Sequence, residues 1–336
     1  MTEYVDNLLL AVAALASVIA VLAWVGAWCA TVLTSVGALH ERTAPLEPRR
    51  PASWGLLDVL GAAALIHCAP LVGSEVEKIL PRYFDVTEFA SVAAAISGLA
   101  TSLAVLFAFV LSIAFVSLRT GSTFRDLGFD LSHTIRDLWL GVSSFVLIGP
   151  VVFAIQMALT HWFPSEHPLL ESVRAHPSFA TLTNVAVAAL LVAPLIEEFL
   201  FRVLLQGWME RVATIRGGMA ALVMGEPAPP QRSEASTALD RDEPNTSVAE
   251  MPKKSAADDV PTSFFLRWLP IVCSAGVFAL LHVGHGPDPI PLFVFALALG
   301  YLYQRTGRIL PSLTLHFLLN GVSLIMLMIE VYGPRA

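Results

Sequence analysis

Long apolar runs recur along almost the whole chain and constrain its fold more than any other feature. A bilayer core about 30 Å thick needs roughly 20 apolar residues in each helix that crosses it. The runs lie at about 8–37, 54–74, 89–118, 138–163, 179–206, 264–283, 289–303 and 310–330. We therefore predict an all-α fold, a polytopic transmembrane helix bundle of about eight spans.

Composition also places the chain in the membrane class. It is 56% hydrophobic and only 14% charged, whereas a soluble domain carries about 25% charged residues. Its formal net charge of −7 arises mostly from acids in the loops. Because the chain has no basic run, we expect no nucleic-acid partner. The partner that the composition predicts is the lipid bilayer.

Basic residues in the loops predict the orientation. Residues 39–53 and 119–137 contain several arginines, and the loop before the last span contains more. Cytoplasmic loops carry an excess of Lys and Arg. Loops one, three and seven are therefore predicted to lie on the cytoplasmic side, with both termini outside.

Residues 217–262 differ from the rest of the chain. They are rich in Pro, Ser, Ala and acids, and they contain no aromatic residue. Such a segment cannot bury enough surface to offset the entropy of ordering it, so we predict a disordered loop. We divide the chain into 1–136, with about three N-terminal transmembrane helices and basic loops, and 137–330, a core interrupted by this loop.

Three charged residues lie inside the fifth apolar run. An ion at the centre of a transmembrane helix costs about 2.5–3.5 kcal/mol, so such residues indicate a functional site. Glu198 and Arg202 are four residues apart and can pair on one helix face. Glu197 points about 100° away from Glu198 and has no such partner on its own helix. Glu197 is therefore the candidate base, because desolvation makes a carboxylate a stronger base. The Glu198–Arg202 pair either supports the site or only locks helix packing.

Polar residues recur in the later apolar runs. His282 follows Phe278 by four positions and Asn320 follows His316 by four, so each pair shares a helix face. A single histidine in an apolar helix is more often a packed core residue, and an asparagine there needs a hydrogen-bond partner. Together with Glu197, however, these residues form a candidate site on three segments.

Other polar residues within the spans have simpler interpretations. Asp58 and His67 lie on opposite faces of the second span and are predicted to be isolated. Gln156 and Asn184 are predicted to form hydrogen bonds that support helix packing.

Depth in the membrane raises a difficulty for the candidate site. Glu197 and Asn320 lie near the middle of their runs, but His282 lies near the end of its run. At 1.5 Å per residue the mismatch is about 10–15 Å. We therefore expect the sixth span to begin later, near Leu269, with 262–268 at the interface.

Three motifs occur in order within these apolar runs. The run Glu197–Arg202 reads EEFLFR and matches EExxxR, Phe278–His282 matches FxxxH, and His316–Asn320 matches HxxxN. Gly300 and the Thr306-Gly307 pair precede the last motif. In this combination the chain resembles the CPBP family of intramembrane proteases, also called the Abi or type II CAAX prenyl endopeptidase family.

The resemblance covers about 180–325. It implies an intramembrane endopeptidase, in the plasma membrane of a bacterium, that cleaves a membrane protein or a lipidated peptide. By resemblance, Glu197 would be the general base and His282 would hold and polarise the attacking water. His316 and Asn320 would donate hydrogen bonds to the oxyanion, a role worth roughly 3–4 kcal/mol per donor in other enzymes. The residues that would brace the site are Glu198, Arg202 and Phe278.

Alternatives to this interpretation stay open. A glutamate-dependent protease needs no cofactor, but Glu197, His282 and His316 could instead bind zinc or another divalent metal, with water as the fourth ligand. No HExxH motif is present in the sequence. A bundle with buried Glu, Arg and His could also be a transporter, although no internal repeat is evident. A non-proteolytic scaffold of the same family is a further alternative.

Overall fold

The computed structural model describes residues 46–47, 50–83, 90–162, 179–214, 218–226, 264–284 and 286–332. Within these ranges the regular elements are all helical, which confirms the predicted all-α fold. The first are α2 (Leu56–Cys68), α3 (Leu71–Ile79), η1 (Leu80–Arg82), α4 (Ala90–Thr120) and α5 (Thr134–Thr160). They are followed by α7 (Phe179–Val187), η2 (Ala188–Val192), α8 (Ala193–Glu197), η3 (Glu198–Gln206), α9 (Gly207–Ala213), α10 (Met219–Met224), α12 (Phe264–Leu280), α13 (Pro289–Thr306) and α14 (Leu310–Tyr332).

Several of these helices suit a bilayer. Four in the described part of the chain are long and apolar enough to cross one: Leu56–Arg82, Ala95–Thr120, Thr134–Thr160 and Leu310–Ile329. On α4, large apolar side chains such as Leu103 and Phe107 are more than half exposed, as expected for a surface that faces lipid. The chain is an integral membrane protein. The predicted first span at 8–37 lies outside the described residues, and the count of eight spans stays a prediction.

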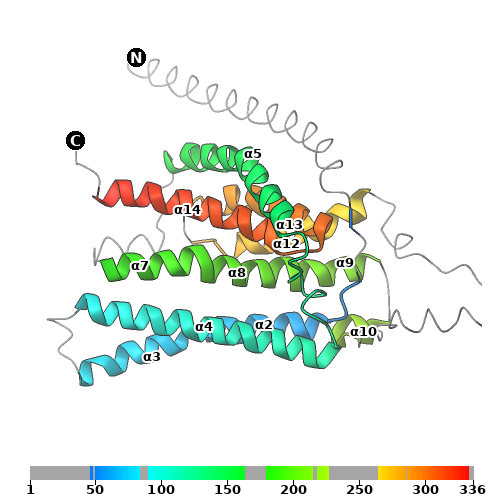
Figure 1. The fold of residues 1–336 in the computed structure, drawn as a ribbon, viewed down its shortest axis with the longest axis horizontal. Helices are drawn as coiled ribbons and strands as arrows, with labels where there is room; N and C mark the ends of the chain where they lie inside the picture. Colours follow the sequence, from blue (N-terminus) through cyan, green and yellow to red (C-terminus); the bar gives the residue numbers. More distant parts are fainter. Residues whose placement is uncertain are drawn as a thin grey trace, which may run out of the picture.

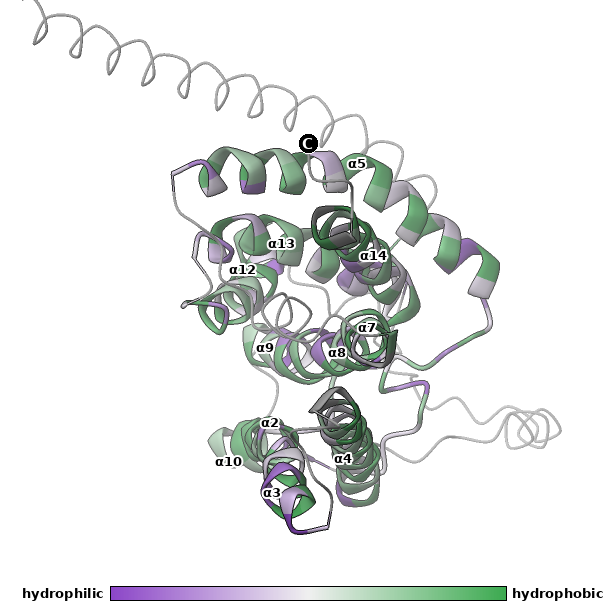
Figure 2. Ribbon diagram, turned by 90° about the vertical axis from the view of Figure 1, so that its left-hand side faces the viewer, coloured by the Kyte–Doolittle hydropathy of each residue, from purple (hydrophilic) through white to green (hydrophobic). Residues whose placement is uncertain are grey.

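A long central rod organises the bundle (Figure 1). It runs through α7, η2, α8, η3 and α9 in one line. One face of the rod packs against α2 and α4, and the opposite face packs against α12, α13 and α14. Figure 2 views these helices nearly end-on and shows them as successive layers, with α5 outermost against α13 and α14. The EExxxR motif on the rod therefore faces the helices that carry the other two motifs.

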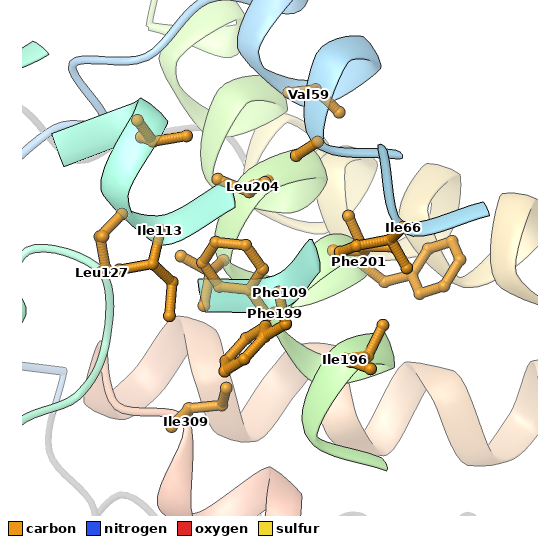
Figure 3. Packing of buried hydrophobic residues seen from close by; sticks show 14 of the residues in the cluster. Val59, Ile66, Phe109, Ile113, Leu127, Ile196, Phe199, Phe201, Leu204 and Ile309 are labelled. Carbon is orange, nitrogen blue, oxygen red and sulfur yellow. The ribbon is translucent and has the colours of Figure 1, made fainter. Parts of the chain in front are cut away.

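The buried apolar core joins both predicted parts of the chain. Phe109 of α4 meets Phe199 of η3 edge-on, with ring centroids 5.2 Å apart. Phe129 packs near both rings. Figure 3 shows this cluster extending from Val59 of α2 to Ile309, just before α14. Residues from both sides of the predicted division thus share one continuous core.

Polar loops meet at one end of the bundle. Arg308, in the turn before α14, pairs with Asp137 of α5 at 2.6 Å and with Glu47 of the first connector. Arg119, at the end of α4, pairs with Asp58 of α2. These contacts confirm that loops one, three and seven lie at the same end of the bundle. That this end faces the cytoplasm stays a prediction. The prediction that Asp58 is isolated is wrong, because α2 and α4 are neighbours.

The other polar residues within the spans behave as predicted. His67 bonds within its own helix, to the carbonyl of Ala63 at 2.8 Å. Gln156 donates to Asp288 at 2.7 Å, and Asn184 donates to the carbonyl of Ala95 at 2.7 Å. The predicted packing hydrogen bonds of Gln156 and Asn184 are therefore confirmed.

The segment expected to be disordered at 217–262 begins with an ordered helix, which corrects that prediction at its start. Trp208 Nε1 donates to the carbonyl of Leu222 on α10 at 2.9 Å, and Arg119 donates to the carbonyl of Met224. The backbone N–H of Glu226 bonds to the carbonyl of Ser53 at 2.8 Å. The local composition did not predict this helix, because the residues that hold it in place lie elsewhere in the chain. Residues 227–262 lie outside the described residues.

Helices α12 and α13 form an antiparallel hairpin. Near its open end, Trp268 stacks on Tyr301 with ring centroids 5.9 Å apart, and Gln304 donates to the carbonyl of Arg267. Its turn, described at 281–284 and 286–288, carries His282. The pair ends short of the far tip of α14 (Figure 1), so its turn lies beside the middle of the bundle.

This hairpin bears on the predicted mismatch in depth. Helix α12 is helical from Phe264, and a sixth span that begins near Leu269, with 262–268 at the interface, stays a prediction. Helix α12 runs from the end where the polar loops meet to the turn that carries His282. His282 therefore lies at the closed end of the hairpin, where its ring contacts that of Phe278.

Candidate active site

The rod changes its hydrogen-bond register just before the first motif. In η2, a π-helix, the N–H of Ala193 bonds to the carbonyl of Ala188, five residues earlier. In that register the next donor, for the carbonyl of Ala189, would be residue 194. Residue 194 is a proline and has no N–H. The side-chain amide of Asn320 on α14 replaces that donor, with Nδ2 2.8 Å from the Ala189 oxygen.

The two adjacent glutamates have different surroundings. The Glu198 side chain is fully buried, with one oxygen 3.5 Å from Arg202 Nε. Its other oxygen accepts a hydrogen bond from His316 Nδ1 at 3.0 Å. The Glu197 side chain remains 26% exposed, and one of its oxygens lies 3.5 Å from His316 Nε2. His316 therefore connects two carboxylates, one on each ring nitrogen.

This arrangement constrains where protons lie. An ionised carboxylate only accepts hydrogen bonds, so the ring nitrogen of His316 that bonds to Glu198 carries a hydrogen. In a neutral ring the other nitrogen then presents a lone pair to Glu197. That nitrogen lies 3.5 Å from the Glu197 oxygen, which is longer than a normal hydrogen bond. A carboxylate beside an imidazole is an arrangement that general acid–base chemistry uses.

Arg202 is held from several directions. Its side chain is fully buried, and its Nη1 lies 3.5 Å from the hydroxyl of Ser274 on α12. Ser274 in turn donates to the carbonyl of Phe201 at 2.7 Å. The guanidinium carbon lies 5.2 Å from the centroid of the Phe278 ring, within the range of a cation–π contact. The first motif is thus attached to the helix that carries the second.

His282 joins this group through Phe278. The two rings have centroids 4.8 Å apart, and the Phe278 ring lies 6.3 Å from that of His316. The Nδ1 of His282 lies 2.8 Å from the carbonyl of Phe278. A carbonyl only accepts, so Nδ1 carries the hydrogen and Nε2 carries the lone pair in the neutral ring.

The structure explains why glycine occupies two positions before the HxxxN motif. A Cβ on Gly300 would lie 2.8 Å from Gln206 Oε1, so glycine allows α13 to approach the rod closely. Gly307 ends α13 at φ +65°, a left-handed conformation that glycine adopts without strain. The chain then turns back into α14, which carries His316.

The structure thus brings most of the predicted site residues together. Direct contacts join six of them: Glu197, Glu198, Arg202, Phe278, His282 and His316. Asn320 lies one turn beyond His316 and bonds to the rod two turns before Glu197. Their roles in catalysis stay predictions.

Some neighbours of the site were missed from the sequence. Ser274 precedes Phe278 and His282 by four and eight positions, and this helical spacing was the available signal. The ring of Phe295 meets that of His316 edge-on at 5.1 Å. No local pattern points to Phe295, which is one apolar residue among many in α13. The bond between Glu198 and His316 was also missed, because it joins distant segments.

The donor set was also considered for metal binding. Among the residues that the structure describes, no group of three or more His, Cys, Asp or Glu side chains has the arrangement of a metal site. Zinc binding by Glu197, His282 and His316 stays an untested alternative.

Comparison with known proteins shows which family part of the chain is similar to. Residues 259–322 match the family model described as type II CAAX prenyl endopeptidase Rce1-like. No curated protein and no solved structure matches the chain. The matched residues contain the FxxxH and HxxxN motifs, while EExxxR lies before them on the rod that they contact. The resemblance predicted from the three motifs is confirmed here: over α12, α13 and the first half of α14, the chain is similar to the type II CAAX prenyl endopeptidases of the Rce1-like family.

Proposed function

We propose that this protein is an intramembrane endopeptidase that hydrolyses a peptide bond of a membrane protein or a lipidated peptide. The observation that carries the proposal is the contact of His316 with both glutamates of the first motif. A partly exposed carboxylate beside an imidazole can activate water, and the buried carboxylate behind it can hold that imidazole in place.

In the proposed mechanism Glu197 removes a proton from water as the oxygen attacks the peptide carbonyl. His282 accepts a hydrogen bond from the same water through Nε2, the ring nitrogen left with the lone pair. The tetrahedral intermediate then collapses as the C–N bond breaks, and Glu197 returns the proton to the departing amine. The products are a carboxylic acid, which then releases its proton to water, and an amine.

The developing oxyanion needs hydrogen-bond donors. His316 is proposed to donate from Nε2 when a proton occupies that nitrogen. Asn320 has a second amide hydrogen besides the one bonded to Ala189, and it is proposed to donate that hydrogen. Arg202 pairs with Glu198 and not with the proposed reacting groups. Its positive charge is therefore proposed to act on the reaction only through Glu198.

The test is proteolysis by the purified protein in lipid nanodiscs. Candidate substrates are membrane peptides with and without a prenyl group, and Glu197→Gln serves as the inactive form for trapping bound substrate from native membranes, read by mass spectrometry. The proposal expects defined cleavage products with the natural chain and captured, uncut substrate with the variant. Identical peptide profiles from both proteins would overturn it.

A further inference from the structure

Polar side chains continue along the rod beyond the candidate site. Glu198, Arg202, Gln206 and Glu210 follow one another at intervals of four residues. The first three are fully buried, and Glu210 is half-buried. They lead from His316 towards the end of α9, where the polar loops of the bundle meet.

Several atoms of this column lack a hydrogen-bond partner among the described residues. They are Glu198 Oε2, Arg202 Nε and Nη2, and Gln206 Oε1. Glu198 Oε2 and Arg202 Nε lie 3.5 Å apart, which is longer than a normal hydrogen bond. Buried donors and acceptors are nearly always satisfied, if not by protein then by water. Unsatisfied donors and acceptors one turn apart indicate a small occupant that can both donate and accept.

Gln206 is oriented so that its carbonyl oxygen is the unpaired atom. Its Nε2 donates to the carbonyl of Gly300 at 2.9 Å and to Glu210 Oε1 at 3.1 Å. Both amide hydrogens are therefore used, and Oε1 is left as an acceptor beside Gly300, where a Cβ would crowd it. Glu210 Oε1 also lies 3.4 Å from Gln304 Nε2, which donates to the carbonyl of Arg267. The chain of contacts thus reaches the outer end of the α12–α13 hairpin.

We propose that Glu198, Arg202 and Gln206 hold buried water that is continuous, through Glu210, with the aqueous end of the bundle, and that this column supplies water to the candidate active site. The proposal rests on the proposed hydrolytic function. Each cleavage consumes one water, whose hydroxyl joins the carbonyl carbon as the C–N bond breaks and whose remaining proton goes to the amine. An apolar substrate can arrive through the lipid, whereas water needs a polar route.

The decisive experiment is hydroxyl-radical footprinting by X-ray pulses on the full-length protein in nanodiscs, because radicals formed from bound water label the side chains beside it. Phe278, 1% exposed, contacts Arg202. Phe199, which is fully buried, lies on the same rod but packs against α4, which makes it a matched control. We expect Phe278 to be labelled faster than Phe199, and Gln206→Leu to remove that difference. Equal labelling of the two rings in the natural chain would overturn the proposal.

Activity provides a second and separable readout. Gln206→Leu should lower kcat with little change in KM, because it affects the supply of water and not the binding of substrate. Asn184→Leu, which removes a half-buried amide elsewhere on the rod, should leave kcat unchanged. Loss of kcat in both variants alike would count against the column. A labelled Phe278 in a protein that cleaves nothing would keep the water column and overturn the proposed proteolysis instead.

Discussion

Glu198 and His316 are 118 positions apart in the chain, yet a carboxylate oxygen of the first accepts a hydrogen bond from Nδ1 of the second at 3.0 Å. This bond fixes the ring orientation and directs Nε2 towards Glu197. Glu198 therefore does more than neutralise Arg202. It acts as a positioning residue for the imidazole that faces the candidate base.

Replacing Glu198 should destabilise the protein. Glu198→Gln leaves the buried Arg202 without its counter-ion, and breaking a buried ion pair costs about 3–5 kcal/mol. The free energy of unfolding in detergent is expected to fall accordingly. The double variant Glu198→Gln with Arg202→Met should recover part of the loss, because no buried charge is then left unpaired. A double variant less stable than Glu198→Gln alone would contradict this explanation.

Asn320 is expected to have two separable functions. Asn320→Ala should lower stability, because the carbonyl of Ala189 loses the donor that Pro194 cannot provide. It should also lower activity about 10²–10³-fold if its second amide hydrogen stabilises the oxyanion. Pro194→Ala supplies a backbone N–H to the same carbonyl. It therefore serves as a background in which the effects of Asn320 on stability and on activity can be separated.

In the Pro194→Ala background, Asn320→Ala should cost less stability but the same factor in activity. Thermal unfolding and cleavage rates of the four proteins measure both effects. If activity recovers together with stability, Asn320 acts only on the packing of the rod. Its predicted role as an oxyanion donor would then be wrong.

The sequence predicted most of the helices because apolar length and helix spacing are local properties. The same spacing identified the pair Glu198–Arg202 and the shared faces of His316 with Asn320 and Phe278 with His282. It did not predict how the hairpin of α12 and α13 packs against the rod, since local composition does not show which helices are neighbours. The side chain of Asn320 replaces the backbone N–H that Pro194 lacks. This depends on a change of hydrogen-bond register in the rod, which the spacing of apolar residues does not predict. Asp58 was likewise misassigned because its partner, Arg119, lies on another helix.

The long loop can be tested in two parts. Replacing 227–262 by a short Gly/Ser linker should leave the melting temperature nearly unchanged, because its composition provides little to bury and loop closure depends only weakly on length. Replacing 217–262 should lower it, because this also removes α10 and its bonds to Trp208 and Arg119. Equal melting temperatures for the two variants would show that α10 contributes nothing. Retained stability with lost cleavage in the shorter replacement would identify a docking segment for substrate.

Acid stability should depend on Glu47. Burial alone raises the pKa of its carboxyl group, but the hydrogen bond and charge of Arg308, together with Arg136, outweigh burial and hold that pKa below its ordinary value of 4.5. A lowered folded-state pKa stabilises the protein above the unfolded-state value, and this stabilisation is lost as pH falls through the folded-state value. The melting temperature should therefore decline below about pH 4.5, and less steeply in Glu47→Gln. Glu75→Gln, at an exposed pair with Lys78, is the control and should leave the decline unchanged.

The last prediction separates a glutamate-activated water from a metal-activated one. Glu197→Gln keeps the size of the side chain but removes its basicity, so cleavage should fall by about 10²–10⁴, as for other general bases. Stability should change little, because Glu197 is partly exposed and its contact with His316 is 3.5 Å long. In the glutamate mechanism, a chelator leaves the rate of the natural chain unchanged, and the purified protein contains no stoichiometric zinc. Chelator inhibition that is reversed by added zinc, with metal lost in both Glu197→Gln and His316→Ala, would contradict the glutamate mechanism and assign these side chains to a metal site.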